Sequence, residues 1–321
     1  MKGEEVREAV TRMLHGEMDT PAIVDVLTRI EAEGVGAEQI AAGAAVMRKN
    51  MIRVDVPDGA IDIVGTGGTG LKTLSISTAT AIVVAACGVP VAKHGNRGAS
   101  SPTGTADTLS ELGVNLAMSA ERAAAAVSDI GMGFLYAPTY HPALRHVGPA
   151  RKEIGKRTLF NRLGPLCNPG SVKTMLLGVA VREELEPIAE ALAHDPDITA
   201  LVVRGRDGLD EITITDITDI VMVSDGKTER GTLDASGLVQ PPVTIDDLRG
   251  GDPKANADAL RDLLDGHATP YQEIVLLNAS EALQLAIPDL PDGQGYVRAI
   301  HAIESGKARR KLKELVSYSH G

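Results

Sequence analysis

The sequence predicts an α/β fold in which a mostly parallel central sheet is wrapped by helices, with a small all-helical N-terminal subdomain. Three observations support this prediction. From about residue 60 onward, short apolar segments alternate with helical stretches, which is typical of a parallel sheet covered on both faces. The first 50 residues contain no segment that alternates as a strand would. The length of 321 residues is enough for two domains.

The N-terminal residues are predicted to form three helices. Val6, Val10 and Leu14 lie four residues apart, as on one face of a helix, and apolar residues again share one face in residues 24–30. The alanine-rich segment Glu38 to Met47 is expected to form the third helix. We therefore predict a helical subdomain at residues 1–55, joined by part of about 140–170, and an α/β domain at residues 56–321.

The elements of the α/β domain follow in order along the chain. Strands are expected at Ile61–Val64, Val89–Lys93, Phe134–Ala137, Met175–Val181 and Ala200–Val203, with an antiparallel extension at Thr213–Ile214 and Ile220–Val223. Helices are expected at Ser77–Cys87, Ser119–Ile130, Glu183–Leu192, Ala255–Leu264, Tyr271–Ala286, Val297–Glu304 and Ala308–Val316. In such sheets, ligands bind beyond the carboxyl ends of the strands.

Composition excludes several classes of function. The net charge is −11 and only 2% of the residues are aromatic, with no Trp, which argues against general binding to nucleic acids or anionic membranes. Cys87 and Cys167 form neither a disulfide framework nor a CxxC motif. The N-terminus lacks the pattern of a signal peptide, and the longest apolar stretch, residues 79–92, is interrupted by Gly88 and Pro90. We expect a soluble cytoplasmic protein.

A glycine-rich loop, Gly65-Thr66-Gly67-Gly68-Thr69-Gly70, directly follows the first predicted strand. Such glycines allow backbone N–H groups to converge on an anion. A dinucleotide-binding loop would need an acidic residue at the tip of the next strand, where Lys93-His94-Gly95-Asn96-Arg97 stands instead. A P-loop is disfavoured because Leu71 separates Gly70 from Lys72-Thr73. A phosphate cradle of another kind remains, with a simple tight turn as the alternative.

Further polar groups are expected at the same edge of the sheet. Ser75 to Thr78 begin an apolar helix, where hydroxyls and free N–H groups bind phosphate, unless they serve only as a helix cap. Lys93 to Ser101 bring two cations to the end of the second strand, although a solvated loop is the alternative. Asp210-Glu211 suits Mg²⁺, but alone it is no more than surface charge. Together these groups predict a pyrophosphate-bearing substrate, Mg²⁺ and no covalent nucleophile.

The motifs resemble those of the anthranilate phosphoribosyltransferase family. The resemblance covers nearly the whole chain and is carried by DIVGTGG at 62–68, Ser77-Thr78, KHGNR at 93–97, FLYAP at 134–138, HPA at 141–143, RTLFN at 157–161, LGPL at 163–166, Asp210-Glu211, GGDP at 250–253 and LNA at 277–279. The family joins anthranilate to phosphoribosyl pyrophosphate (PRPP), giving N-(5-phosphoribosyl)anthranilate and pyrophosphate in tryptophan biosynthesis. It shares its fold with class II nucleoside phosphorylases and is usually a homodimer through the helical subdomain.

The resemblance implies roles for individual residues. Lys93, Arg151 and Glu211 would be catalytic, and a metal, Mg²⁺ with two ions per subunit, would be held by Ser77, Asp210 and Glu211. The residues expected around PRPP are Gly65, Gly68, Thr69, Thr73, Ser75, Ile76, Ser77, Thr78, Lys93, His94, Gly95, Asn96, Arg97, Gly98, Ala99, Ser100, Ser101 and Thr105. Those expected around anthranilate are Gly65, Asn96, Pro138, His141 and Arg151.

Two positions depart from the family pattern. Thr69 stands where the family usually has the acidic residue of GTGGD, and Ser75 replaces the Asn of its N-x-S-T run. We expect these changes to tune metal dependence or PRPP affinity. The alternative functions are a pyrimidine nucleoside phosphorylase of the same fold, a phosphoribosyltransferase for another aromatic amine, a non-catalytic binding protein, and a nicotinamide-dependent dehydrogenase.

Overall fold

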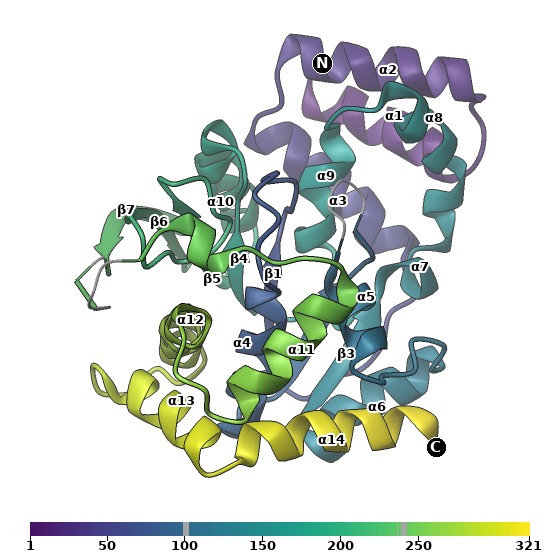
Figure 1. Ribbon diagram of the computed structural model, residues 1–321. Helices are drawn as coiled ribbons and strands as arrows, with labels where there is room; N and C mark the ends of the chain where they lie inside the picture. Colours follow the sequence, from purple (N-terminus) through teal and green to yellow (C-terminus); the bar gives the residue numbers. More distant parts are fainter. Residues whose placement is uncertain (99–102, 236, 239–242) are drawn as a thin grey trace.

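The computed structural model describes residues 1–98, 103–235, 237–238 and 243–321. The three predicted N-terminal helices are confirmed, as α1 (Gly3–Leu14), α2 (Thr20–Glu33) and α3 (Ala37–Asn50). Two short helices from the middle of the chain, α8 (Gly148–Ile154) and α9 (Leu159–Leu163), pack against α2, and α9 also packs against α3. Figure 1 shows this helical group at the opposite end of the molecule from the C-terminal helix α14 (Lys307–His320). We propose that these segments form one subdomain.

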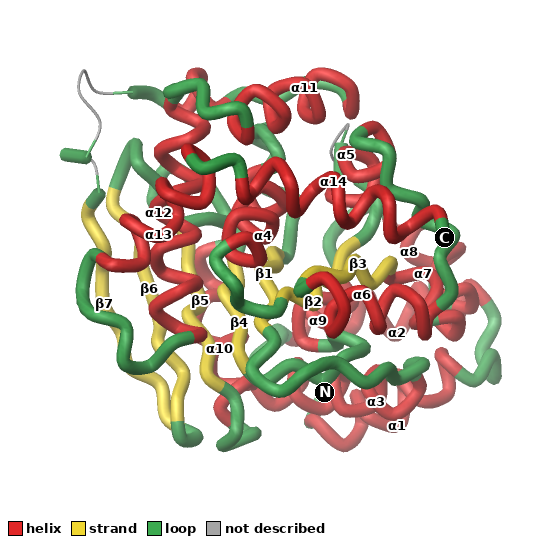
Figure 2. Tube along the Cα trace, turned by 90° about the horizontal axis from the view of Figure 1, so that it is seen from below, coloured by secondary structure: helices red, strands yellow, loops and turns green. Residues whose placement is uncertain are grey.

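A seven-stranded sheet forms the centre of the α/β part, in the order β3-β2-β1-β4-β5-β6-β7. Figure 2 shows the strands side by side from β7 at one edge to β3 at the other. The strands are β1 (Ile61–Gly65), β2 (Val91–Gly95), β3 (Met132–Tyr136), β4 (Thr174–Gly178), β5 (Thr199–Gly205), β6 (Ile217–Ser224) and β7 (Lys227–Asp234). Strands β1 to β5 pair in parallel, whereas β6 and β7 are antiparallel, so the prediction of a mostly parallel sheet is confirmed.

The prediction of a strand at Thr213–Ile214 is wrong. This segment is a turn between β5 and β6, and side chains rather than a neighbouring strand bind its polar groups. The Thr213 hydroxyl donates to Asp207 Oδ2 at 2.5 Å, the Thr215 hydroxyl donates to the same oxygen, and the Thr213 amide donates to Thr218 Oγ1 at 3.0 Å. Of the two residues that suggested a strand, Thr213 therefore binds a carboxylate and Ile214 is buried in the hydrophobic core.

Helices cover both faces of the sheet. On one face α4 (Ile76–Ala86) and α12 (Pro270–Ala286) pack against each other and on β1 and β4, and α12 is buried along most of its length, as predicted. On the other face α10 (Leu185–Ala193) packs on β5 and β6 and against α3. Further helices are α5 (Thr105–Glu111), α6 (Ala120–Ile130), α11 (Pro253–Leu264) and α13 (Gln294–Glu304). Among the described residues, no helix is long and apolar enough to cross a membrane.

The order of the strands creates a crevice at the ends of β1 and β4. The chain passes from β1 outward through β2 to β3 and then returns to add β4 on the other side of β1. In open α/β sheets this reversal is where ligands bind, beyond the carboxyl ends of the strands. Here those two ends are Gly65 and Gly178, which lie opposite each other in the sheet.

Gly133 offers a test of how closely a helix approaches this sheet. A Cβ atom at Gly133 in β3 would lie 2.3 Å from the Ala123 carbonyl oxygen and 2.6 Å from Val127 Cγ2, both on α6. We expect Gly133→Ala to push α6 away and to lower the free energy of unfolding by about 1–3 kcal/mol in urea denaturation. Gly148→Ala is the control, because a Cβ there has no atom within 4 Å. Equal midpoints for the two variants would contradict this packing.

Candidate active site

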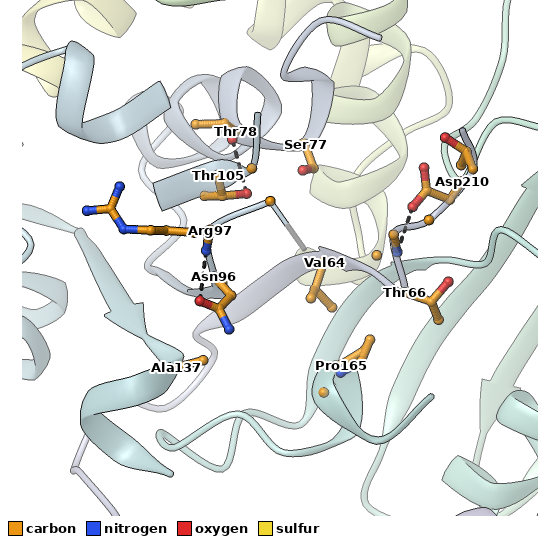
Figure 3. A pocket seen from close by; sticks show the side chains of 18 of the residues that line it. Val64, Thr66, Ser77, Thr78, Asn96, Arg97, Thr105, Ala137, Pro165 and Asp210 are labelled. Carbon is orange, nitrogen blue, oxygen red and sulfur yellow. Dashed lines mark hydrogen bonds between the residues drawn. The ribbon is translucent and has the colours of Figure 1, made fainter. Parts of the chain in front are cut away.

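A cavity of about 360 Å³ lies at the crevice beyond β1 and is lined by residues from both parts of the molecule. Lys93, Arg151 and Glu211 all line it, although they come from β2, α8 and the loop after β5. Figure 3 shows Ser77, from the start of α4, and Asp210, the neighbour of Glu211, beside the same space. The residues expected to act together are therefore brought together.

Most of the residues expected to bind substrates line this cavity. For PRPP these are Gly65, Gly68, Thr69, Thr73, Ser75, Ile76, Ser77, Thr78, Lys93, His94, Gly95, Asn96, Arg97, Gly98 and Thr105. Ala99, Ser100 and Ser101 lie outside the described residues. On the acceptor side Asn96, His141 and Arg151 line the cavity, but Pro138 does not, because it is exposed in the short helix α7 (Ala137–Tyr140) and its neighbour Ala137 takes that place.

The glycine-rich loop has the backbone conformation that an anion nest requires. Gly67, Gly68 and Gly70 have φ values of +62°, +83° and +75°, which L-residues with side chains rarely adopt. The Gly67 amide donates to Asp210 Oδ2 at 3.1 Å. The loop is also tied to the end of β4, because the Thr66 amide donates to the Gly178 carbonyl oxygen at 2.9 Å.

Lys93 reaches the cavity from within the sheet. It is 1% exposed, and its Nζ donates to the Ile63 carbonyl oxygen and, at 3.4 Å, to Ser77 Oγ. Burial lowers the pKa of Lys93, while the charges of Asp62 and Glu211 oppose this shift. The charge of Asp62, and that of Glu211 when it is ionised, therefore favours a protonated Lys93 in this buried position, where an ammonium group interacts strongly with a phosphate.

Asp62 supports this lysine and was not assigned a role from the sequence. It is fully buried, accepts from the His94 amide at 3.2 Å, and accepts from Asn168 Nδ2 at 2.8 Å. Burial raises the pKa of Asp62 to about 6, although the Lys93 charge and the hydrogen bond from Asn168 act in the opposite direction. Asp62 was visible in the DIVGTGG motif, but Asn168 is 106 positions away, and nothing local in the sequence joins the two.

The carboxylates of Asp210 and Glu211 are positioned from the core. Asn278 in the buried helix α12 binds both backbone groups of Ile212, the residue that follows Glu211. Its Oδ1 accepts from the Ile212 amide at 3.0 Å, and its Nδ2 donates to the Ile212 carbonyl oxygen at 2.8 Å. Burial and the neighbouring Asp210 raise the pKa of Glu211 to about 8, and burial raises that of Asp210. A backbone hydrogen bond from Ser77 acts against the shift of Glu211, which places helix α4 beside this carboxylate.

This set of oxygen donors fits Mg²⁺. Two adjacent carboxylates, each less ready to ionise than usual, and the Ser77 hydroxyl form a site whose repulsion a divalent cation would relieve. The described residues contain no group of three or more His, Cys, Asp or Glu side chains arranged to hold a metal alone. Mg²⁺ typically binds one or two carboxylates and completes its coordination with waters and substrate phosphates. The donor set agrees with such a shared site.

Asp107 holds the loop after β2 and was also missed from the sequence. Its carboxylate accepts from Arg97 Nη1 at 2.7 Å, the Gly98 amide at 2.9 Å and the Gly104 amide at 3.0 Å. The signal that could have found it is the spacing of Gly104 and Asp107 at the start of α5, where an acidic residue at the third helical position typically binds back to the cap.

The two departures from the family pattern form local contacts. Thr69 Oγ1 accepts from the Leu71 amide at 3.3 Å, so this hydroxyl supports the turn of the glycine-rich loop. Ser75 Oγ lies 2.7 Å from Thr108 Oγ1 and accepts from Asn256 Nδ2 at 3.4 Å. Position 75 therefore joins the start of α4 to α5 and α11.

One cation and several aromatic rings also line the cavity. The Arg151 guanidinium carbon lies 5.9 Å from the centre of the Phe160 ring. Burial lowers the pKa of Arg151, and no acidic residue of the described chain raises that pKa. Among the described residues this arginine therefore has no ionic partner. The His94 and His141 rings lie 5.2 Å apart, and burial lowers the pKa of both, that of His94 to about 3. Both imidazoles are therefore neutral at pH 7.

Comparison with known proteins identifies the family. Residues 58–309 match the family described as "Glycosyl transferase family, a/b domain". An anthranilate phosphoribosyltransferase of Methylobacterium nodulans is 45% identical over 317 residues, which cover 99% of this chain and 94% of that protein. The chain belongs to the anthranilate phosphoribosyltransferase family.

Solved structures of anthranilate phosphoribosyltransferases have the same fold. The crystal structure of the enzyme from Thermus thermophilus has a TM-score of 0.92 and 36% identity, and the match covers 100% of this chain and 96% of that one. The enzyme from Saccharomyces cerevisiae in complex with PRPP and Mg has a TM-score of 0.91 and 27% identity, with 100% and 94% coverage. The predicted α/β fold class and family are thus confirmed.

The raised pKa of Glu211 leads to a prediction about magnesium. A carboxylate whose pKa is about 8 in the metal-free protein is mostly protonated at pH 7, and Mg²⁺ binding must displace that proton. We expect the Mg²⁺ concentration for half-maximal activity to fall roughly tenfold between about pH 7 and about pH 9. Calorimetry in buffers of different ionisation enthalpy should detect the released proton. A half-saturating concentration that is constant over this range, or Mg²⁺-dependent turnover by Glu211→Ala, would contradict the role of Glu211.

Proposed function

We propose that this protein transfers the phosphoribosyl group of PRPP to the amine of anthranilate, giving N-(5-phosphoribosyl)anthranilate and pyrophosphate, in tryptophan biosynthesis. One observation carries the proposal: a single cavity is lined by the glycine-rich loop, Lys93 and two carboxylates, and also by Arg151, which has no ionic partner among the described residues. The names of its relatives support it, as do yeast structures described in complex with PRPP and Mg and with 4-fluoroanthranilate.

The donor end has the groups that a doubly phosphorylated sugar needs. The amides of the glycine-rich loop, the hydroxyls at the start of α4 and the loop after β2 surround one space. Ser77, Asp210 and Glu211 would hold Mg²⁺, and we propose two ions per subunit. When bound, Mg²⁺ would neutralise charge on the pyrophosphate. Lys93 would add a fixed positive charge beside the same leaving group.

The acceptor end selects an aromatic acid. The Arg151 guanidinium can pair with the carboxylate of anthranilate in a bidentate fork, which would aim the neighbouring amine at the ribose C1 carbon. As the bond from C1 to pyrophosphate breaks, C1 becomes oxocarbenium-like, and the amine nitrogen attacks from the opposite face with inversion. The amine proton becomes acidic once the C–N bond has formed, so positioning and charge stabilisation supply most of the catalysis.

The direct test is the loss of anthranilate fluorescence on addition of PRPP and Mg²⁺, followed by detection of pyrophosphate. No loss with active-site-intact protein would overturn the proposal. Parallel incubation with thymidine and phosphate tests the nucleoside phosphorylase alternative, and other aromatic amines test acceptor specificity.

Assembly and location are proposals as well. We propose a homodimer that forms through the helical subdomain at residues 1–55 with part of about 140–170, and action in the cytoplasm. The family resemblance supports the first, and a dimer mass in sedimentation that is lost on substitution of surface residues of α1 to α3 would test it.

Arg151 gives the sharpest test of the acceptor site. Because it would bind the anthranilate carboxylate, we expect Arg151→Ala to raise the KM for anthranilate by about 10- to 100-fold, with a much smaller change in the KM for PRPP. Arg145→Ala is the matched control, because Arg145 is exposed on the adjacent turn and is not among the residues that line the cavity. Equal effects of Arg151→Ala on both KM values would remove this assignment.

A further inference from the structure

A row of four charged side chains, one of them buried and three partly buried, joins helix α2 to the turn before α10. Glu184, whose side chain is 7% exposed, accepts from two arginines: Arg157 Nη2 lies 2.9 Å from its Oε2, and Arg162 Nη2 lies 2.9 Å from its Oε1. Arg162 Nη1 lies 2.9 Å from Glu31 Oε1 in helix α2. The charges alternate in sign along the row, so each has an opposite neighbour.

Arg157 extends this row to the glycine-rich loop. Its Nη1 donates to the Gly67 carbonyl oxygen at 2.7 Å. The amide of the same glycine donates to Asp210 Oδ2 at 3.1 Å. Gly67 has φ +62° and no side chain, so only its backbone groups can hold it in place. Both of these groups are bound, one by Arg157 and the other by the carboxylate expected to bind the metal.

None of the four charged residues is among the described residues that line the cavity. Arg157 therefore reaches the site through the Gly67 peptide rather than by lining the cavity itself. Arg157 also lies between α8, which carries Arg151, and α9, which carries Phe160. One short segment thus holds the donor loop and carries the residues of the acceptor end.

We propose that Arg157 and Glu184 are positioning residues that hold the Gly67 peptide against Asp210 and so keep the PRPP and metal site in its binding geometry. This inference rests on the proposed function. Only an arginine suits the position, because the planar guanidinium binds a carbonyl oxygen and a carboxylate at once, whereas an ammonium group lacks this fixed fork. Glu184 fixes the orientation of that fork, as outer residues commonly do for metal-binding groups.

The test compares two arginines that share Glu184. We expect Arg157→Gln to raise the KM for PRPP and the half-saturating Mg²⁺ concentration about tenfold or more, with the KM for anthranilate within about twofold. Arg162→Gln is the matched control: it also loses an ion pair with Glu184, but the ion pairs of Arg162 within the described chain go to Glu184 and Glu31 rather than to the loop. Arg162→Gln should lower the Tm and leave the KM for PRPP and the half-saturating Mg²⁺ concentration within about twofold of the wild-type values. Arg157→Lys should fall between Arg157→Gln and the wild type.

Calorimetry of PRPP binding with Mg²⁺ gives a readout independent of turnover. An Arg157→Gln protein that binds PRPP as tightly as the wild type would overturn the inference. An Arg162→Gln protein whose PRPP binding is weakened as much as that of Arg157→Gln would overturn it too. If Arg157→Gln does not fold, Glu184→Gln and Arg157→Lys decide by the same criteria. Asp210→Asn distinguishes a failure of the metal assignment from a failure of the positioning role. If it leaves Mg²⁺ dependence unchanged, the metal assignment fails; if it impairs Mg²⁺ use while Arg157→Gln does not, only the positioning role fails.

Discussion

The close approach of Asp210 to the ends of β1 and β4 is the constraint on which the site depends. A Cβ atom at Gly178 would lie 1.7 Å from the Asp210 carbonyl oxygen, and one at Gly65 would lie 2.7 Å from its Oδ2. Only glycine at both strand ends leaves room for a carboxylate where the strand order reverses. The loop amides, the start of α4 and Lys93 line the same cavity as that carboxylate, so this steric requirement allows the donors for an anion and the donors for a cation to share one site.

The electrostatics of the site work against the charge of the whole chain. A protein with net charge −11 repels anionic ligands at long range, and the cavity offsets this locally with Lys93, Arg97 and Arg151. Burial strengthens these interactions and also lowers the pKa values of Lys93 and Arg151. The charge of Asp62, and that of Glu211 when it is ionised, opposes the lowering of the lysine pKa, and this makes Asp62, which no substrate needs to touch, part of the site.

The site residues that could be predicted from the sequence are those that stand next to one another in the chain and closely follow a strand. The loop from Gly65, the helix start at Ser75 and the run from Lys93 each carry several functional residues in a row, and parallel strands bring such runs to one edge. Prediction from the sequence failed where two distant residues act as a pair, as with Asp62 and Asn168, since pairing across the fold leaves no periodic signal. It also missed β7, because that strand is polar and exposed along nearly all its length.

The composition of β7 affects how copies of this protein can associate. Four of its eight residues are charged, namely Lys227, Glu229, Arg230 and Asp234, and its outer edge ends the sheet. A polar edge of this kind is a poor template for a strand from another molecule, which protects the sheet from joining its neighbours edge to edge. Contacts between copies of this protein are therefore not expected to extend the sheet at its β7 edge.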